Sequence, residues 1–308
     1  MRFRELNPGG LNAPRSSVGA EFKPRPDVEV QAFRKSLPRK TSLEALLINR
    51  NTDTLVVALH GALGRGKYKL PRFEWLRTVG GMPTSSMYFS DPALRLHPRL
   101  ELAWFTGWSG CDVPAIIVDW VRRAAEVVGA SRVIFQGSSG GGFASLQLSS
   151  LMPNSMALAF NGQTDISAYR VSGVRYSAQR QYLRVVWPEV FRQLPDGNAD
   201  TISPAWKKYV DDRVSAVDRY RSPQGNYLFM VQNRDEFHYE QHFEPLTASL
   251  VEAGVGFRLH TKLYRNGPGH FGPPPSVHCE ALNEALEMCQ GLPGIFDSVP
   301  DPRVSRTG

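Results

Sequence analysis

Cysteine is scarce in this chain. Its 308 residues include three cysteines, Cys111, Cys279 and Cys289, with no regular spacing. A small, odd and unpatterned set argues against a disulfide framework and against a cysteine-based zinc site, and it is typical of a reducing compartment. We therefore predict a cytoplasmic location.

Long apolar segments are also lacking. No apolar run approaches the ~18 residues that a membrane-spanning helix needs, and residues 1–8 lack the apolar stretch of a signal peptide. Arginines are spread along the chain, and no helix-turn-helix, RNP or zinc-finger pattern is present, so we do not expect a nucleic-acid partner. The net charge of +7 is compatible with a positive active-site rim that attracts anions, or with a solvated arginine-rich surface.

Short apolar segments of strand type alternate with segments of helical periodicity along most of the chain. The clearest strand candidates are residues 55–59, 85–89, 132–135, 156–160 and 227–231. Several of them are wholly apolar, which indicates parallel strands covered on both faces by helices. We predict an α/β fold with a mostly parallel sheet.

The alternation of strands and helices also suggests a division of the chain. We expect an irregular N-terminal arm (1–25), a core made of residues 26–164 and 226–291, an inserted cap (165–225) and a Pro-rich tail (292–308). The cap would cover the carboxyl edge of the sheet, where ligands bind in open α/β sheets. Its arginines and tyrosines suit a carbohydrate or an anionic group, although a solvated helix face would carry the same residues.

A Gly-Ser-Ser-Gly-Gly segment at 137–141 lies between a predicted strand and a predicted helix at 143–152. Strand, tight turn and helix in this order are the context of a nucleophile elbow, in which the hydroxyl of Ser139 projects from the end of the sheet. Ser138 as nucleophile would require glycine where the chain has Gln136. A P-loop would require Lys-Ser/Thr where the chain has Phe143 and Ala144, and the glycine spacing differs from a dinucleotide fingerprint.

A serine hydroxyl needs a base, and the base needs an orienting carboxylate. In the chain order serine, acid, histidine, we predict Asp235 as the acid and His270 as the base, because each follows a predicted strand. Asp165 also follows a strand and is an alternative acid. Glu236 is expected to point elsewhere on the same turn.

Two backbone N–H groups are predicted to form the oxyanion hole. They belong to Gly140, at the start of the elbow helix, and to Ala62, in the loop after the strand at 55–59. His60 would shape that loop. His238 and His242 have a spacing that can ligate a metal on a helix, but no third ligand accompanies them, so we predict no metal site.

Taken together, these motifs resemble the α/β-hydrolase superfamily over residues 50–290. The resemblance implies an eight-strand, mostly parallel sheet with Ser139, Asp235 and His270 as the catalytic triad. The glycine-rich run at 137–142 is similar to that of prolyl-oligopeptidase-type peptidases. Segments 64–75 and 90–94 resemble hydrolase-fold proteins of bacterial surface-glycan systems, which implies an O-acyl group on a glycan as the substrate.

The sequence thus predicts a serine hydrolase that cleaves a carboxylic ester of a polar or glycan-linked substrate through an acyl-enzyme. This chemistry requires no metal or organic cofactor. The same residues would serve an O-acyltransferase, in which an acceptor hydroxyl replaces water, or a serine peptidase. A non-enzymatic binding protein on a hydrolase scaffold is the remaining alternative, and the sequence leaves the oligomeric state open.

Overall fold

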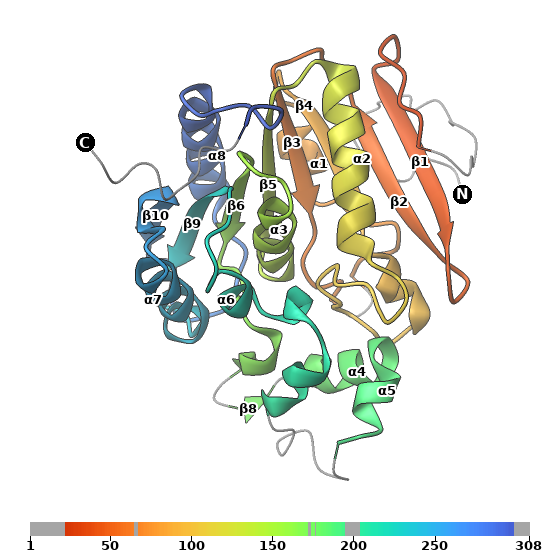
Figure 1. Cartoon of the computed structure of the whole chain (residues 1–308), viewed down its shortest axis with the longest axis vertical. Helices are drawn as coiled ribbons and strands as arrows, with labels where there is room; N and C mark the ends of the chain where they lie inside the picture. The colour runs from red at the N-terminus through yellow and green to blue at the C-terminus, as the bar shows by residue number, and fades with distance from the viewer. Residues whose placement is uncertain (1–21, 65–66, 172–173, 176, 195–203, 299–308) are drawn as a thin grey trace.

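The computed structural model describes residues 22–64, 67–171, 174–175, 177–194 and 204–298. Its central sheet has eight strands in the spatial order β1-β2-β4-β3-β5-β6-β9-β10 (Figure 1). The strands are β1 (Val30–Leu37), β2 (Thr41–Ile48), β3 (Thr54–Leu59), β4 (Ser85–Ser90), β5 (Arg132–Ser138), β6 (Met156–Phe160), β9 (Tyr227–Asn233) and β10 (Leu259–Tyr264). β2 pairs antiparallel with β1 and β4, and the other five pairs are parallel. The prediction of an eight-strand, mostly parallel sheet is confirmed.

The central strands are buried on both faces. β3, β4 and β6 are buried along their whole length. Because successive side chains of a strand point to opposite faces, Leu55 and Val57 belong to one hydrophobic core and Val56 and Ala58 to the other. This explains why the strands read as continuous apolar runs and not as alternating ones.

Helices cover both faces of the sheet. α2 (Val113–Val128) packs in the first core, and α8 (Pro275–Gln290) packs in the second, on the opposite face. α2 begins after Asp112, whose carboxylate accepts a hydrogen bond from the N–H of Ala115 at 3.0 Å, and it ends at Gly129 with φ of 73°. Aspartate and glycine are residues typical of these two cap positions.

Residues 239–252 do not form a single regular α-helix. A π-helical turn, η7 (Tyr239–Phe243), continues into α7 (Glu244–Glu252). Pro245 has no N–H to donate to the carbonyl of Gln241, so the regular α-helical bond is missing where the two segments meet. A short 3₁₀ helix, η8 (Gly256–Arg258), then precedes β10.

The segment between β6 and β9 lies outside the central sheet. It contains η3 (Ile166–Ala168), β7 (Arg170–Val171), β8 (Val174–Arg175), α4 (Ser177–Val186), α5 (Pro188–Phe191), η5 (Pro204–Tyr209), η6 (Asp212–Val214) and α6 (Ala216–Arg219). η5 and η6 are both 3₁₀ helices. In Figure 1, α4 and α5 lie beyond the end of the sheet toward which the arrows of β3 and β9 point, which is the carboxyl edge. α6 returns to the sheet, where Ala216 packs in a third core.

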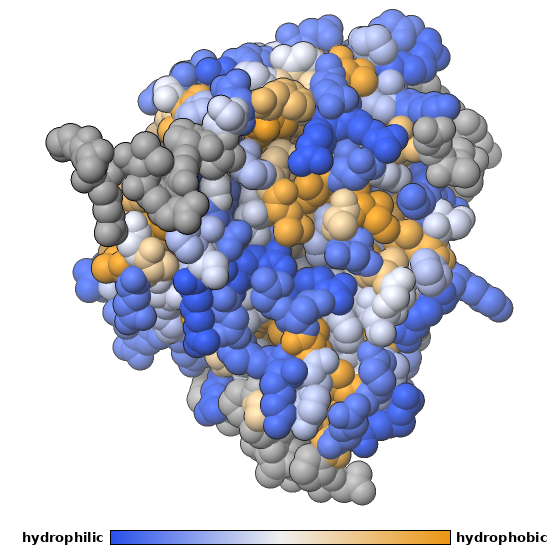
Figure 2. All heavy atoms as spheres, in the orientation of Figure 1, coloured by the Kyte–Doolittle hydropathy of each residue, from blue (hydrophilic) through white to orange (hydrophobic). Residues whose placement is uncertain are grey.

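Parts of the predicted arm, cap and tail lie outside the described residues. Residues 1–21 and 299–308 lie outside the described residues, and so does 195–203 in the predicted cap. Residues 22–25, which we placed in the arm, join the body of the molecule, because the ring of Phe22 stacks on that of Trp120 with centroids 4.5 Å apart. Polar residues cover most of the face shown in Figure 2, with small apolar areas between them.

Within the described ranges, no helix is both long and apolar enough to cross a membrane. The cytoplasmic location and the absence of a nucleic-acid partner stay predictions.

Candidate active site

Ser139 lies in a sharp turn between β5 and α3 (Gly140–Ser150). Its backbone has φ of 57° and ψ of −118°, and its N–H donates to the carbonyl of Phe160 at 2.9 Å. Residues with side chains rarely adopt positive φ, and such strain is typical of functional turns. The elbow predicted from the glycine spacing therefore has the expected strand, turn and helix.

The glycines of the elbow permit a close crossing of strand and helix. A Cβ atom on Gly137 would lie 2.4 Å from the carbonyl oxygen of Gly141, and a Cβ on Gly141 would lie 2.4 Å from that of Leu59. Both contacts are with backbone atoms, which cannot move aside without shifting a strand or a helix. Glycine at these two positions is therefore a steric requirement.

We expect Gly141→Ala to lower the free energy of unfolding by about 3 kcal/mol, because it overpacks the contact between α3 and β3. The matched control is Gly256→Ala, whose Cβ would meet its nearest neighbour at 3.5 Å, an ordinary contact. Urea unfolding of both variants measures the difference. Equal stability of the two variants would contradict the steric account.

His270 reaches Ser139 from the loop that follows β10. Its Nε2 lies 2.8 Å from the Oγ of Ser139, so the serine hydroxyl can donate its proton to the ring. The imidazole packs against the ring of His238, with centroids 4.1 Å apart. The structure thus brings together the two residues that the sequence analysis paired.

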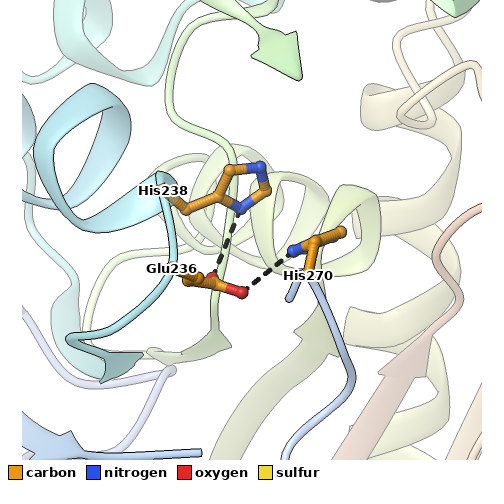
Figure 3. A group of neighbouring side chains, drawn as sticks. All are labelled: Glu236, His238 and His270. Atoms are coloured by element: carbon orange, nitrogen blue, oxygen red, sulfur yellow. Dashed lines mark hydrogen bonds and ion pairs between the residues drawn. The ribbon is translucent and has the colours of Figure 1, made fainter. Parts of the chain in front are cut away.

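The carboxylate beside His270 belongs to Glu236. Its Oε2 lies 3.2 Å from Nδ1 of His270 (Figure 3). Its Oε1 accepts a hydrogen bond from the side chain of Gln232 at 3.0 Å. The Glu236 side chain is fully buried. Burial and a second hydrogen bond hold this carboxylate in one orientation toward the imidazole.

Asp235 does not occupy the position that we predicted for it. Its carboxylate forms an ion pair with Arg265 at 2.5 Å and accepts a hydrogen bond from the N–H of Gly267 at 3.2 Å. Asp235 and Glu236 are consecutive residues of one turn, and their side chains leave it in different directions. Asp235 therefore fastens the base of the His270 loop, and Glu236 faces the ring.

The alternative acid, Asp165, is committed to other partners. Its carboxylate accepts hydrogen bonds from the N–H and hydroxyl of Ser167 and from the hydroxyl of Ser215, and it pairs with Lys207 at 2.8 Å. These contacts connect η3 with η5 and α6. Asp165 serves the structure of the inserted segment.

The loop after β3 leaves one N–H group available near the elbow. The N–H of Gly61 donates to Glu74 at 2.8 Å, and that of Leu63 donates to the carbonyl of Glu101 at 2.9 Å. Between them, the N–H of Ala62 has no hydrogen-bond partner among the described residues. A Cβ built on Gly61 would lie 3.7 Å from Cβ of Ser139, so this loop runs beside the nucleophile.

His60 and Arg72 fix the direction of the Ala62 N–H. The carbonyl of Gly61 faces Nδ1 of His60 at 2.7 Å and Nη1 of Arg72 at 3.5 Å. Because the C=O and N–H of a trans peptide point in opposite directions, the N–H of Ala62 points away from both side chains. Arg72 also donates to the Ala62 carbonyl and pairs with Glu74 at 2.7 Å, which clamps the loop.

His60 shapes the loop as a neutral ring. Its Nε2 accepts a hydrogen bond from the N–H of Asp91 at 3.0 Å, so Nδ1 carries the proton that faces Gly61. Burial lowers the pKa of His60 to about 3. A ring that stays neutral and holds two backbone groups is suited to positioning.

Gln163 contacts the nucleophile and carries no sequence motif that could have indicated it. Its Nε2 donates to Oγ of Ser139 at 2.9 Å, and its Oε1 accepts from the indole N–H of Trp104 at 3.1 Å. Since an indole nitrogen can only donate, this bond fixes the amide with its NH₂ group toward Ser139. Gln163 is completely buried, just after β6.

His238 and His242 lie next to His270 and are also buried. Nδ1 of His238 faces the carbonyl of Asn161 at 2.9 Å, and Nδ1 of His242 accepts from the N–H of Thr164 at 3.3 Å. Glu236, His238 and His270 present possible ligand atoms within 4.8 Å of one another. Within this grouping, Glu236 contacts Nδ1 of His270, and Nδ1 of His238 already faces a carbonyl.

The buried histidines make the fold sensitive to acid. Burial lowers the pKa of His60 and of His242 to about 3, and that of His238 well below its usual value. In the unfolded chain each ring takes up a proton near pH 6.5. The stability that the neutral rings confer is therefore complete above pH 6.5 and is lost as the pH falls toward 3, by about 1.4 kcal/mol per pH unit for each ring.

Buried carboxyl groups oppose this trend in part. Burial raises the pKa of Asp91 to about 6, and partial burial raises that of Glu74, so each group adds stability as the pH falls through its raised pKa. Burial also lowers the pKa of a fourth histidine, His278, to about 4. The four histidines therefore outweigh the two carboxyl groups. We expect the free energy of unfolding in urea to fall from pH 7 to pH 5; a constant or rising value would contradict this balance.

No protein-family model matches the chain, and no curated protein matches it in sequence. The capsule O-acetyltransferase of Neisseria meningitidis serogroup A is similar in structure, with a TM-score of 0.57 at 13% identity, over 84% of this chain and 94% of that one. Carboxyl esterase 2 of Tuber melanosporum has a TM-score of 0.53 at 14% identity, over 95% of this chain and 94% of that one.

A third similar structure is the glycosylation-associated Gap123 complex of Streptococcus agalactiae, with a TM-score of 0.59 at 14% identity. It is matched over 84% of this chain and 46% of the other. Identities this low show the fold and no more. Together with the sheet order, they establish that this chain has the α/β-hydrolase fold, and its structural neighbours include esterases, an O-acetyltransferase and peptidases.

Proposed function

We propose that this protein is a serine hydrolase that cleaves a carboxylic ester through an acyl-enzyme. One observation carries the proposal: Glu236, His270 and Ser139 form a continuous line of contacts at 3.2 and 2.8 Å. A serine, a histidine and a buried carboxylate in this geometry are the arrangement that activates a hydroxyl for attack on a carbonyl. In this proposal Glu236 takes the role for which the sequence suggested Asp235.

The proposed reaction has two halves. Oγ of Ser139 attacks the carbonyl carbon while Nε2 of His270 takes its proton, and Glu236 stabilises the resulting imidazolium. The oxyanion is held by the N–H groups of Gly140 and Ala62, each of which would contribute about 3 kcal/mol to the stabilisation of the transition state. His270 then gives its proton to the departing alcohol, and in the second half it activates the water that releases the acid.

Gln163 adds a donor that favours the second half. When water attacks the acyl-enzyme, Oγ of Ser139 is the leaving atom and gains negative charge, which the N–H of Gln163 stabilises at 2.9 Å. In the resting enzyme, the same bond leaves the serine proton directed at His270. Gln163 is thus positioned to assist deacylation more than acylation.

We expect Gln163→Leu to slow deacylation by about 100-fold, the effect of losing one donor to a developing oxyanion. Stopped-flow assays with an activated ester would then show a larger burst followed by a slower steady state. Gln147→Leu, which removes a buried glutamine bonded to the carbonyl of Asp212, is the matched control. An unchanged burst and steady-state rate for Gln163→Leu would exclude this role.

An O-acyltransferase is the second candidate function. The observation that favours it is the likeness to the capsule O-acetyltransferase, which extends over nearly the whole of that chain. The same residues would form the acyl-enzyme, and a sugar hydroxyl would take the place of water. A serine peptidase requires the same residues, and the acylaminoacyl peptidase of Pyrococcus horikoshii is a structural neighbour, with a TM-score of 0.51.

The test of the proposed function is an ester panel. Purified wild-type protein is assayed with p-nitrophenyl esters of increasing acyl length and with O-acetylated saccharides, with and without added oligosaccharide acceptors. We expect release of free acid, favouring short acyl groups on polar alcohols. Acyl transfer to an acceptor without free acid would establish the second candidate, and inactivity of the folded protein on every donor would overturn both.

A further inference from the structure

A cavity of about 390 Å³ lies between the β1–β2 turn, the segment after η2 (Pro92–Leu96) and helix α4. Its lining residues are Arg39, Leu96, His97, Arg99, Gln181, Arg184 and Val185. Three arginines and no carboxylate are found among the described residues that line the cavity. The lining therefore carries a formal charge of +3 with His97 neutral.

Two of these arginines have no counter-charge. Neither Arg99 nor Arg184 forms an ion pair with any residue in the part of the chain that the structure describes, and both side chains are exposed. Elsewhere on the surface, arginines are commonly paired, as Arg123 is with Asp119 at 3.2 Å. Two unpaired guanidinium groups at one cavity form an anion-attracting site, because guanidinium pairs with phosphate and carboxylate through two parallel hydrogen bonds.

The third arginine is held in place by the fold. Arg39 donates to the carbonyl of Val185 at 2.8 Å and to that of Val186 at 3.5 Å, at the carboxyl end of α4. His97 is also fixed, because its Nδ1 accepts from the N–H of Arg99 at 3.1 Å and faces Nε2 of Gln181 at 3.2 Å. Its ring proton then lies on Nε2, which makes His97 a further donor.

Backbone strain marks the same place. Arg39 and Lys40 form the β1–β2 turn with φ of 59° and 55°. Two consecutive left-handed residues are usual in such a turn, but asparagine and glycine are the residues that suit it. Arginine and lysine in this conformation add backbone strain, which is the kind of local strain found at binding sites.

We propose that this cavity binds an anionic group, a phosphate or a carboxylate, of a small ligand or saccharide. The inference does not depend on the proposed hydrolase activity. The site is connected to the catalytic residues through α4: Tyr182 on this helix packs edge-on against Trp104 with centroids 5.1 Å apart, and Trp104 bonds to Gln163. A series of direct contacts, from Tyr182 through Trp104 and Gln163, therefore connects α4 with Ser139.

The experiment is isothermal titration calorimetry of the full chain at constant ionic strength. Inorganic pyrophosphate and glucuronate are the two probes, and they distinguish phosphate from carboxylate recognition. We expect saturable binding of at least one probe, weakened at least about tenfold in the double variant Arg99→Gln/Arg184→Gln. The control, Arg122→Gln/Arg123→Gln, alters two exposed arginines of α2 and should bind like the wild type.

Both altered residues are exposed, so the variants should fold, which circular dichroism checks. Absence of saturable binding to the wild type, or an equal loss in the control variant, would overturn the proposal. Ester turnover is measured in parallel with an uncharged substrate. Because that assay reports on Ser139 alone, failure of the anion site and failure of the hydrolase proposal can be distinguished.

Discussion

Replacing Ser139 by alanine is expected to lower ester turnover by about 10⁶-fold, because the variant lacks the atom that forms the acyl-enzyme. The oxyanion donors and the binding surface would remain, so a small residual rate above the uncatalysed reaction would persist. Initial rates with an activated ester measure the effect. Thermal unfolding should show little change, since the contacts of the elbow with Phe160 and Leu59 involve backbone atoms.

The neighbouring serine provides the matched control. Ser138 ends β5 and is nearly as buried as the rest of that strand, but it has no contact with His270 among the described residues. Ser138→Ala should therefore keep turnover within a few-fold of the wild type. If Ser138→Ala were inactive and Ser139→Ala active, the register of the elbow would be wrong by one residue.

Glu236→Gln is expected to lower turnover by about 10⁴-fold, the effect of exchanging the triad carboxylate for its amide. The carboxylate accepts from Nδ1 of His270 at 3.2 Å in a buried position. Glutamine would present an NH₂ group there and favour the tautomer with its proton on Nε2, which cannot accept the serine proton. Steady-state kinetics across pH 6–9 measures the loss, which falls on kcat.

Asp235→Asn is the control that separates the two consecutive acids. It removes an ion pair with Arg265, whose side chain is 70% exposed, and exposed pairs contribute about 0–1 kcal/mol to stability. Turnover should therefore stay within about tenfold of the wild type. The reverse order, with Asp235→Asn inactive and Glu236→Gln active, would restore the assignment that the sequence alone suggested.

The difference between these two acids shows what a sequence pattern can resolve. Apolar runs predicted β3, β6 and β9 closely, because a strand buried on both faces tolerates few polar residues. The elbow was predictable because only glycine fits where an added Cβ atom would lie 2.4 Å from a backbone oxygen. The meeting of Ser139 and His270 was predictable because each follows a parallel strand, and parallel strands end at the same edge of the sheet.

Which carboxylate faces His270 depends on the direction of a single turn. The N–H of Asp235 is bonded to the side chain of Asn233 at 3.1 Å in this turn, and the side chain of Asp235 is partly exposed while that of Glu236 is buried. No periodicity encodes such a choice between adjacent residues. Gln163 was missed for a related reason, because its contact with Ser139 depends on Trp104, which is far away in sequence.

The most direct test of the central claim, that Ser139 is a nucleophile activated by His270 and Glu236, is labelling with a fluorophosphonate serine probe. The wild type and Ser139→Ala are treated in parallel, and the adduct is located by peptide mass spectrometry. We expect one adduct in the wild type, on Ser139, and none in the variant. A folded wild type that stays unlabelled, or an adduct on another serine, would contradict it.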